Sequence, residues 1–151
     1  MPIPEIIPIM RIEDYHTHYL GKVHDGRQFW GYQTFVFSKP IDAISGDGWT
    51  KHRREYIVLH TFDINGNYIK TDYEFCGTTD ICDDERSIQK LEDFISALGD
   101  TEYTDIAVKM FTTIIDGYTF GLIPNEEDEN VDLEPSSTIS FHEPWDGEYD
   151  T

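Results

Sequence analysis

The chain has 151 residues, a formal net charge of −19 and a sequence pI of about 4.3. That length fits one domain with its own hydrophobic core. The strong negative charge repels phosphate backbones and anionic membrane surfaces, which disfavours nucleic acids and membranes as partners. Aromatic residues make up 14% of the chain, which favours a folded protein over a disordered one.

Residues 1–10 contain three prolines and are predicted to be extended, because proline and the residue before it avoid helical backbone angles. This start is too short and too interrupted for a signal peptide, and no apolar run is long enough to span a bilayer. Cys76 and Cys82 lack the further Cys or His of a zinc pattern and are interpreted as free, packed thiols. We therefore expect a cytoplasmic protein.

The N-terminal half is predicted to consist of strands. Residues 11–20 are predicted to form a first strand. An Asp25-Gly26 turn separates it from a strand over 29–37, which is expected to be central because both of its faces are apolar. Residues 38–50 read as a loop because they contain proline and two glycines.

Strands over 55–63 and 68–76 are predicted to pair as a hairpin. Asn65-Gly66 lies between them, and a type I′ turn prefers this dipeptide because both central residues need positive φ. The strand over 68–76 alternates between two kinds of side chain. Its inward-facing set is predicted to be Ile69, Thr71, Tyr73 and Phe75, and its outward-facing set Lys70, Asp72 and Glu74.

One helix is predicted over about 83–98, where apolar residues recur at helical spacing. Acidic residues crowd its start, where the helix dipole favours negative charge, and Gly99 follows its end. A second hairpin is predicted from strands over 105–115 and 118–123. Asp116-Gly117 supplies its turn.

Residues 124–130 are predicted to be an acidic loop, followed by short strands over 131–134 and 138–142. Residues 143–151 form an acidic, aromatic tail. Together the elements predict a single α+β domain over 1–151. Its mainly antiparallel sheet is built of hairpins, with the one amphipathic helix packed on a face.

Asp14, His16 and His18 are the candidate metal ligands. On a strand these alternate side chains share one face, and imidazole with carboxylate suits zinc or iron. The alternative is an exposed edge strand that carries polar residues by chance, because a complete site needs a ligand that spacing cannot supply. The nucleophile elbow, the Walker loop and the dinucleotide-binding glycine fingerprint are missing from the sequence. The pattern therefore favours a non-catalytic protein with no cofactor.

Negative charge is concentrated toward the C-terminus, since 11 acidic residues and no Lys or Arg follow Lys109. Four consecutive acids would attract a basic partner protein: Glu126, Glu127, Asp128 and Glu129. The alternative is a solvated, mobile loop. Trp145 is a further candidate contact, because Trp is a frequent binding hot spot, although docking of the tail onto the sheet is the favoured interpretation.

The only basic cluster is Lys51-His52-Arg53-Arg54. Its role stays open between binding a phosphate or a partner's carboxylates and pairing with the acidic C-terminal third. The excess of acid favours the second. His60 lies inside an apolar strand and is interpreted as a buried, hydrogen-bonded structural histidine.

Four stretches spread over most of the chain carry a family resemblance: Thr17-His18-Tyr19-Leu20-Gly21, Asp25-Gly26-Arg27-Gln28-Phe29-Trp30-Gly31-Tyr32, Tyr56-Ile57-Val58-Leu59-His60-Thr61-Phe62-Asp63 and Pro144-Trp145-Asp146-Gly147-Glu148-Tyr149. In them the chain resembles a bacterial family labelled formate hydrogenlyase regulatory protein. The resemblance implies a cytoplasmic regulator that acts by binding, and it assigns no functional residues.

These observations lead to the hypothesis of a non-catalytic, cytoplasmic regulatory protein that binds another, basic protein. One alternative is an immunity-type inhibitor whose acidic surface blocks a basic toxin. Another is a small metal-dependent enzyme that uses Asp14, His16 and His18. A homodimer formed through an exposed sheet edge is a further expectation.

Overall fold

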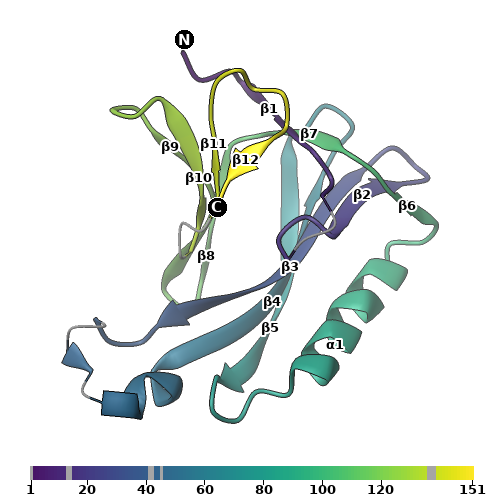
Figure 1. The fold of residues 1–151 in the computed structure, drawn as a ribbon. Coiled ribbons are helices and arrows are strands. Elements are labelled where there is room, and N and C mark those ends of the chain that lie inside the picture. The colour runs from purple at the N-terminus through teal and green to yellow at the C-terminus, as the bar shows by residue number, and fades with distance from the viewer. Residues whose placement is uncertain (1, 13–14, 41–42, 45, 136–138) are drawn as a thin grey trace.

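A computed structural model describes residues 2–12, 15–40, 43–44, 46–135 and 139–151. Within these residues, two five-stranded antiparallel sheets and one α-helix form three layers (Figure 1). The helix covers the outer face of one sheet, and the other sheet covers its inner face. The predicted α+β class is confirmed. In the described part of the chain, the helix is too short and too polar to cross a membrane.

The sheet next to the helix, here called the main sheet, contains the longest strands. In spatial order they are β5 (Tyr68–Thr78), β4 (Arg53–Phe62), β3 (Gln28–Phe37), β2 (Tyr19–Val23) and β6 (Thr101–Tyr103). Most residues of β3 and β4 are buried, because each of these strands has a packed layer on both sides. The prediction of a central strand over 29–37 is confirmed.

The second sheet is built entirely from the C-terminal part of the chain. In spatial order its strands are β12 (Tyr149–Asp150), β11 (Ser140–Phe141), β10 (Asn130–Glu134), β9 (Tyr118–Asn125) and β8 (Phe111–Ile115). A separate two-stranded ribbon joins β1 (Ile6–Ile9) to β7 (Ile106–Lys109). The N-terminal segment is therefore extended, as predicted, and part of it pairs as a strand.

The hydrophobic core has two compartments, one on each face of the main sheet. The larger lies between the two sheets, where Trp30 and Tyr56 are fully buried against residues of the second sheet such as Phe120 and Phe141. The smaller lies under the helix, where Leu91 and Ile95 pack onto the outer face of β3 and β4. Burial of this apolar surface is the main force that holds the three layers together.

Helix α1 spans Asp84–Ser96, inside the predicted range. Asp83 is its N-cap, because its carboxylate accepts a hydrogen bond of 3.2 Å from the backbone N–H of Arg86. Gly99 has a φ of +103°, the left-handed conformation that lets the chain leave a helix.

Three sequence predictions need correction. The predicted strand over 11–20 is mostly irregular, and only Tyr19 and Leu20 belong to β2. The predicted strand over 105–115 is two strands, because the chain leaves the ribbon at Met110 and enters the second sheet as β8. At Asn65-Gly66 only the glycine has positive φ, so the turn is a three-residue loop with a glycine at its end.

Candidate functional site

The three candidate metal ligands are not placed as the sequence suggested. Asp14 lies outside the described residues, while His16 and His18 lie in a turn before β2. They therefore lack the shared strand face on which the metal interpretation depended. Among the residues that the structure describes, no three His, Cys, Asp or Glu side chains could hold a metal ion together. The metal site stays a prediction.

The four consecutive acids form the tip of the β9–β10 hairpin. Glu126, Glu127, Asp128 and Glu129 are exposed, and they make a defined four-residue turn between Asn125 and Asn130. The side chain of Asn125 stabilises this turn, since its amide donates a hydrogen bond of 3.0 Å to the Asp128 carboxylate. The predicted loop over 124–130 is thus shorter than expected, because its two ends belong to strands.

Trp145 belongs to a tail that folds back onto the protein. It is half-buried and packs against the core between the sheets, and its backbone N–H donates a hydrogen bond to the carbonyl of His142. The favoured interpretation of the tail as docked is confirmed. A role of Trp145 in binding a partner stays a prediction.

The basic cluster pairs in part with the acidic third of the chain. Arg54 reaches Asp116 at 3.5 Å, and the Tyr56 hydroxyl donates to the same carboxylate at 2.8 Å. Arg53 instead pairs with Glu55 on its own strand, and its guanidinium lies 3.6 Å from the ring centre of Phe35.

His60 is fully buried, as predicted. One ring nitrogen lies 2.9 Å from the Tyr32 hydroxyl and the other lies 2.7 Å from the Thr71 hydroxyl. Burial lowers the pKa of His60 to about 3, because the charged imidazolium would lose its hydration. The ring is therefore neutral and its contacts are structural.

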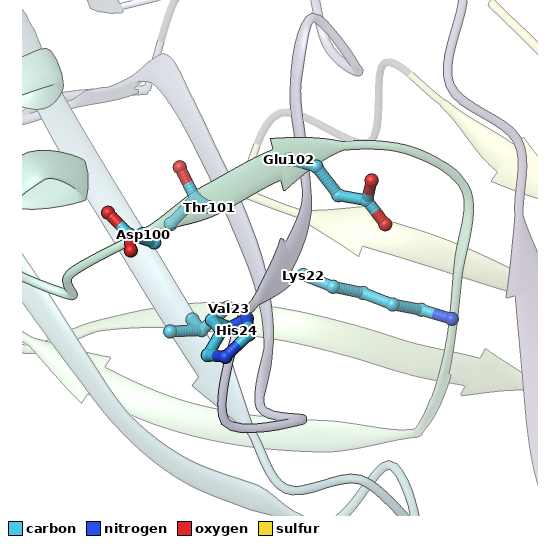
Figure 2. Close-up of a pocket in the computed structure, with 6 residues that line it drawn as sticks. All are labelled: Lys22, Val23, His24, Asp100, Thr101 and Glu102. Atoms are coloured by element: carbon cyan, nitrogen blue, oxygen red, sulfur yellow. The ribbon is translucent and has the colours of Figure 1, made fainter.

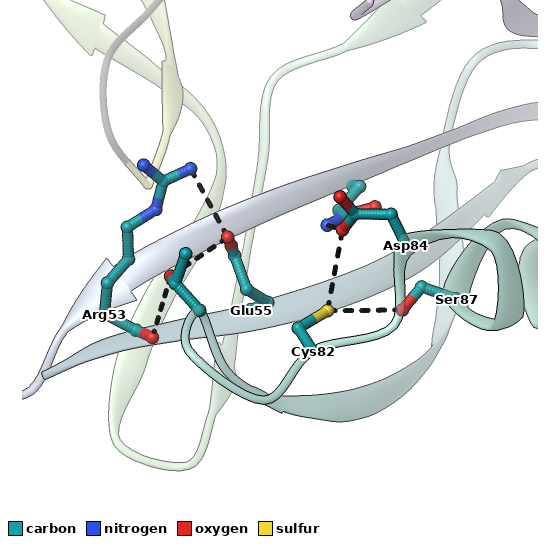
Figure 3. Close-up of polar contacts among 7 residues, drawn as sticks. Arg53, Glu55, Cys82, Asp84 and Ser87 are labelled. Carbon is teal, nitrogen blue, oxygen red and sulfur yellow. Dashed lines mark hydrogen bonds and ion pairs between the residues drawn. The ribbon is translucent and has the colours of Figure 1, made fainter. Parts of the chain in front are cut away.

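A polar cluster lies at the start of α1, on the helix-covered face of the main sheet (Figure 3). Its centre is Glu55, which is 5% exposed. One Glu55 oxygen accepts a hydrogen bond of 3.2 Å from the Thr79 hydroxyl and pairs with Arg53 at 3.4 Å. Farther along, the Cys82 thiol lies 3.5 Å from the hydroxyl of Ser87.

Burial raises the pKa of Glu55, while the Arg53 charge and the Thr79 hydrogen bond oppose the rise. Burial also raises the pKa of the nearby Tyr15 phenol, and the charges of Glu55 and Asp84 add to that increase. A carboxyl group with a raised pKa is often a catalytic acid or base. Here it is held by groups of its own chain with little exposure, which fits a structural tie between β4 and the β5–α1 connection.

The hollows of the described surface are small. One of about 330 Å³ lies at the β2–β6 edge and is lined by Lys22, His24, Asp100 and Glu102 among others. Figure 2 shows the side chains of Asp100 and Lys22 pointing away from each other. Another of about 330 Å³ lies between β5 and the start of α1. In the first hollow the charged groups therefore do not converge on one point, as they would in a substrate site.

The most unusual feature of the described surface is the set of exposed apolar side chains on strand β5. Three of its four large apolar side chains are only partly covered: Ile69 is 48% exposed, Tyr73 is 46% and Phe75 is 39%. Ile64 and Ile81, in the connections at its two ends, are 73% and 74% exposed. Tyr73 and Phe75 share one face of the strand, because they pair with Val58 and Tyr56 of β4. Exposed apolar side chains on one face are typical of a binding surface, and we call these two residues the β5 patch.

Strand β5 also offers an open backbone edge. It is the last strand of the main sheet, and no described strand pairs with its outer side. It is 11 residues long, whereas the other outer strands β6, β8 and β12 have 3, 5 and 2 residues. The unpaired N–H and C=O groups of a long outer strand are ready to pair with another extended chain.

The charges are arranged by layer. The second sheet with its connections, residues 110–151, contains 11 acidic residues and no Lys or Arg. We call this part the acidic layer. The acidic residues that follow Lys109 therefore lie together in one layer of the fold, which gives that layer a negative field.

Sequence reasoning missed the β5 patch. The alternation over 68–76 placed Tyr73 and Phe75 on the correct face, since they pair with Val58 and Tyr56 of the core, but it wrongly predicted that they are covered. It also wrongly placed Ile69 on the inward face, because a register shift puts Tyr68 there, opposite Phe62. Comparison with protein-family models, curated proteins and solved structures finds no match to this chain.

Proposed function

We propose that this protein is a non-catalytic binding module, whose strand β5 takes up an extended segment of a basic partner protein as an additional strand. The observation that carries the proposal is the long, open edge of β5 together with its partly exposed apolar side chains. Strand addition supplies affinity through backbone hydrogen bonds and specificity through the alternating side chains.

The two faces of β5 would contribute differently. Tyr73 and Phe75 share the inner face and continue the hydrophobic core outward, so they are suited to contact apolar side chains of an added strand. The opposite face carries a net negative charge, because it has two acids and one base: Asp72, Glu74 and Lys70. Basic residues at alternate positions of the added strand would meet those acids.

The charge of the whole molecule supports a basic partner. A net charge of −19 and the acidic layer attract a cationic protein and accelerate its encounter. The same charge opposes a second copy of the chain, because two such molecules repel each other. The expected homodimer is therefore the less favoured occupant of the edge. The resemblance to formate hydrogenlyase regulatory proteins agrees with a regulator that acts by binding.

The test is affinity capture at low salt from the organism that encodes the protein, followed by amine cross-linking at Lys70, the only lysine of β5. We expect a partner whose basic segment cross-links to Lys70 and whose capture is lost at high salt. Tyr73→Lys should abolish that capture. The matched control is Ile114→Lys, which makes the same charge change at a 62% exposed isoleucine of β8 and should capture the partner normally.

The possible results separate the candidate occupants. Equal capture by Tyr73→Lys and wild type would overturn the β5 proposal. A partner lost only on reversing the charge of Glu126 and Glu127 would instead favour the immunity-type inhibitor, which binds through the acidic layer. A concentration-dependent dimer that Tyr73→Lys disrupts would identify a second copy as the occupant and exclude the basic segment.

A further inference from the structure

Two cysteines that are six positions apart lie beside the same Ser87 hydroxyl at the end of β5. Cys76 lies on β5 and Cys82 lies just before the N-cap of α1; both are free thiols and half-buried. The connection between them is a tight turn, in which the backbone N–H of Cys82 donates a hydrogen bond of 2.9 Å to the carbonyl of Thr78. The turn therefore brings its two ends toward each other.

Contacts on both sides of this turn hold the cysteines near each other. A side-chain carbon added at Gly77 would lie only 3.2 Å from Ile81, so the two residues next to the cysteines are in contact. The Ser87 hydroxyl donates a hydrogen bond of 2.9 Å to the Asp83 carbonyl, which fixes it beside the Cys82 thiol at 3.5 Å. Cys76 and Ser87 line the same hollow between β5 and α1.

We propose that Cys76 and Cys82 are a redox modification site, which forms a reversible intramolecular disulfide by exchange with a low-molecular-weight disulfide such as oxidised glutathione. This inference is independent of the proposed binding function.

The reaction is two successive exchanges. One cysteine thiolate attacks the small disulfide, forming a mixed disulfide and releasing one glutathione thiolate. The second cysteine thiolate then attacks the protein sulfur of the mixed disulfide, which forms the Cys76–Cys82 bond and releases the second glutathione thiolate. Two protein thiols are oxidised, one glutathione disulfide is reduced, and the two thiol protons pass to the departing thiolates.

The surroundings of the thiols make the exchange slow. Burial raises the pKa of Cys76, and burial likewise raises the pKa of Cys82, although the Ser87 hydroxyl opposes both effects. Thiolates are therefore scarce at neutral pH. The pair is suited to equilibrate with a disulfide pool rather than to react rapidly.

The test incubates the folded full-length protein with oxidised glutathione at mildly alkaline pH, then alkylates the remaining thiols and measures the intact mass. We expect wild type to lose two hydrogens and resist alkylation, and a reductant to reverse this. Cys76→Ser and Cys82→Ser should each stop at a mixed disulfide with one glutathione. A folded wild type that ends with two alkylated cysteines or two bound glutathiones would overturn the proposal.

A second measurement isolates the contribution of the fold, because cysteines this close in sequence also pair in an unfolded chain. The equilibrium constant for disulfide formation with glutathione is measured in buffer and in concentrated urea. We expect it to be at least about tenfold larger in the folded protein, because the turn holds the thiols together. An equal or smaller constant in the folded protein would show that the native turn opposes the bond, and would overturn the proposal.

Discussion

Strands β4 and β5 are neighbours in one hairpin and similarly rich in apolar residues, yet they differ greatly in how far they are buried. Most of β4 is buried, since a helix packs on one face and a sheet on the other. Strand β5 exposes much of its length, because it is the outermost strand of the sheet and has a described neighbour on one side only. The difference teaches that position within the sheet, and not the apolar pattern, decides whether a strand builds the core or a binding surface.

The sharpest test of this comparison uses an aromatic pair that faces across the two strands, Tyr56 of β4 and Phe75 of β5. Tyr56→Ala should lower the free energy of unfolding by about 3–5 kcal/mol, because it leaves a cavity in the core. Phe75→Ala should lower it by about 1 kcal/mol, because the ring is already 39% exposed. Urea unfolding followed by circular dichroism measures both changes.

Tyr56→Phe is the matched control for the first substitution. It retains the ring and removes the hydroxyl, which donates a hydrogen bond of 2.8 Å to Asp116 and accepts one of 3.0 Å from Arg54, so a loss of about 1–2 kcal/mol is expected. Equal losses for the alanine variants of Tyr56 and Phe75 would contradict the view that β4 contributes to the core and β5 to the surface.

The second prediction concerns His60, a histidine of β4 that is fully buried. Its pKa is about 3 in the folded protein and about 6.5 in the unfolded chain, so below pH 6.5 the unfolded state binds the extra proton. Acidification from pH 8 to pH 5 should therefore remove about 2 kcal/mol of stability through this residue. His60→Gln should lose that component when urea unfolding is measured across the range.

His142 acts in the opposite sense in the same range. A hydrogen bond to the Glu143 carbonyl and the nearby Asp150 raise the pKa of this exposed histidine, so its contribution is present at low pH and is lost as the pH rises. The His142 contribution is the same in wild type and in His60→Gln. It therefore cancels when the free energies of unfolding of the two proteins are subtracted at each pH. Parallel pH profiles for the two proteins would refute the buried, neutral state of His60.

The third prediction concerns the helix that covers the outer face of β4. Asp83→Ala removes the N-cap hydrogen bond and should lower the free energy of unfolding by about 1 kcal/mol. Glu85→Ala removes an acidic residue from the same first turn without removing the cap, and should cost less than half as much. Thermal unfolding compares them, and equal losses would assign the effect to charge rather than to the cap.

The smallest expected effect lies on β5 itself. Lys70 and Asp72 form an ion pair of 3.5 Å whose side chains are 56% and 36% exposed. Lys70→Ala should change the free energy of unfolding by less than about 0.5 kcal/mol, because water screens such pairs. A larger loss in chemical unfolding would mean that the β5 surface stabilises the free protein, and would weaken the contrast with β4.

Local patterns predicted a large part of the fold. Helical spacing and an N-terminal acid predicted α1, and Asp116-Gly117 predicted the β8–β9 turn, where both residues have positive φ. The division of residues 105–115 between two sheets was not predictable, because a continuous apolar run does not reveal that its partners change at Met110. Cys76 and Cys82 were recognised as free thiols, but their convergence beside Ser87 depends on how the helix packs.

The sequence by itself determined the elements whose causes are local: the faces of the strands, the start and end of the helix, and the excess of acid after Lys109. Only the tertiary structure decided that β5 is an outer strand, that the acids after Lys109 share one layer, and that two thiols lie beside one Ser87 hydroxyl at the end of β5. The physical reason is that the two-residue repeat of a strand, which can be read from neighbouring residues, sets the side of the sheet to which each side chain points. Whether anything covers that face depends on strand pairing and packing between distant parts of the chain.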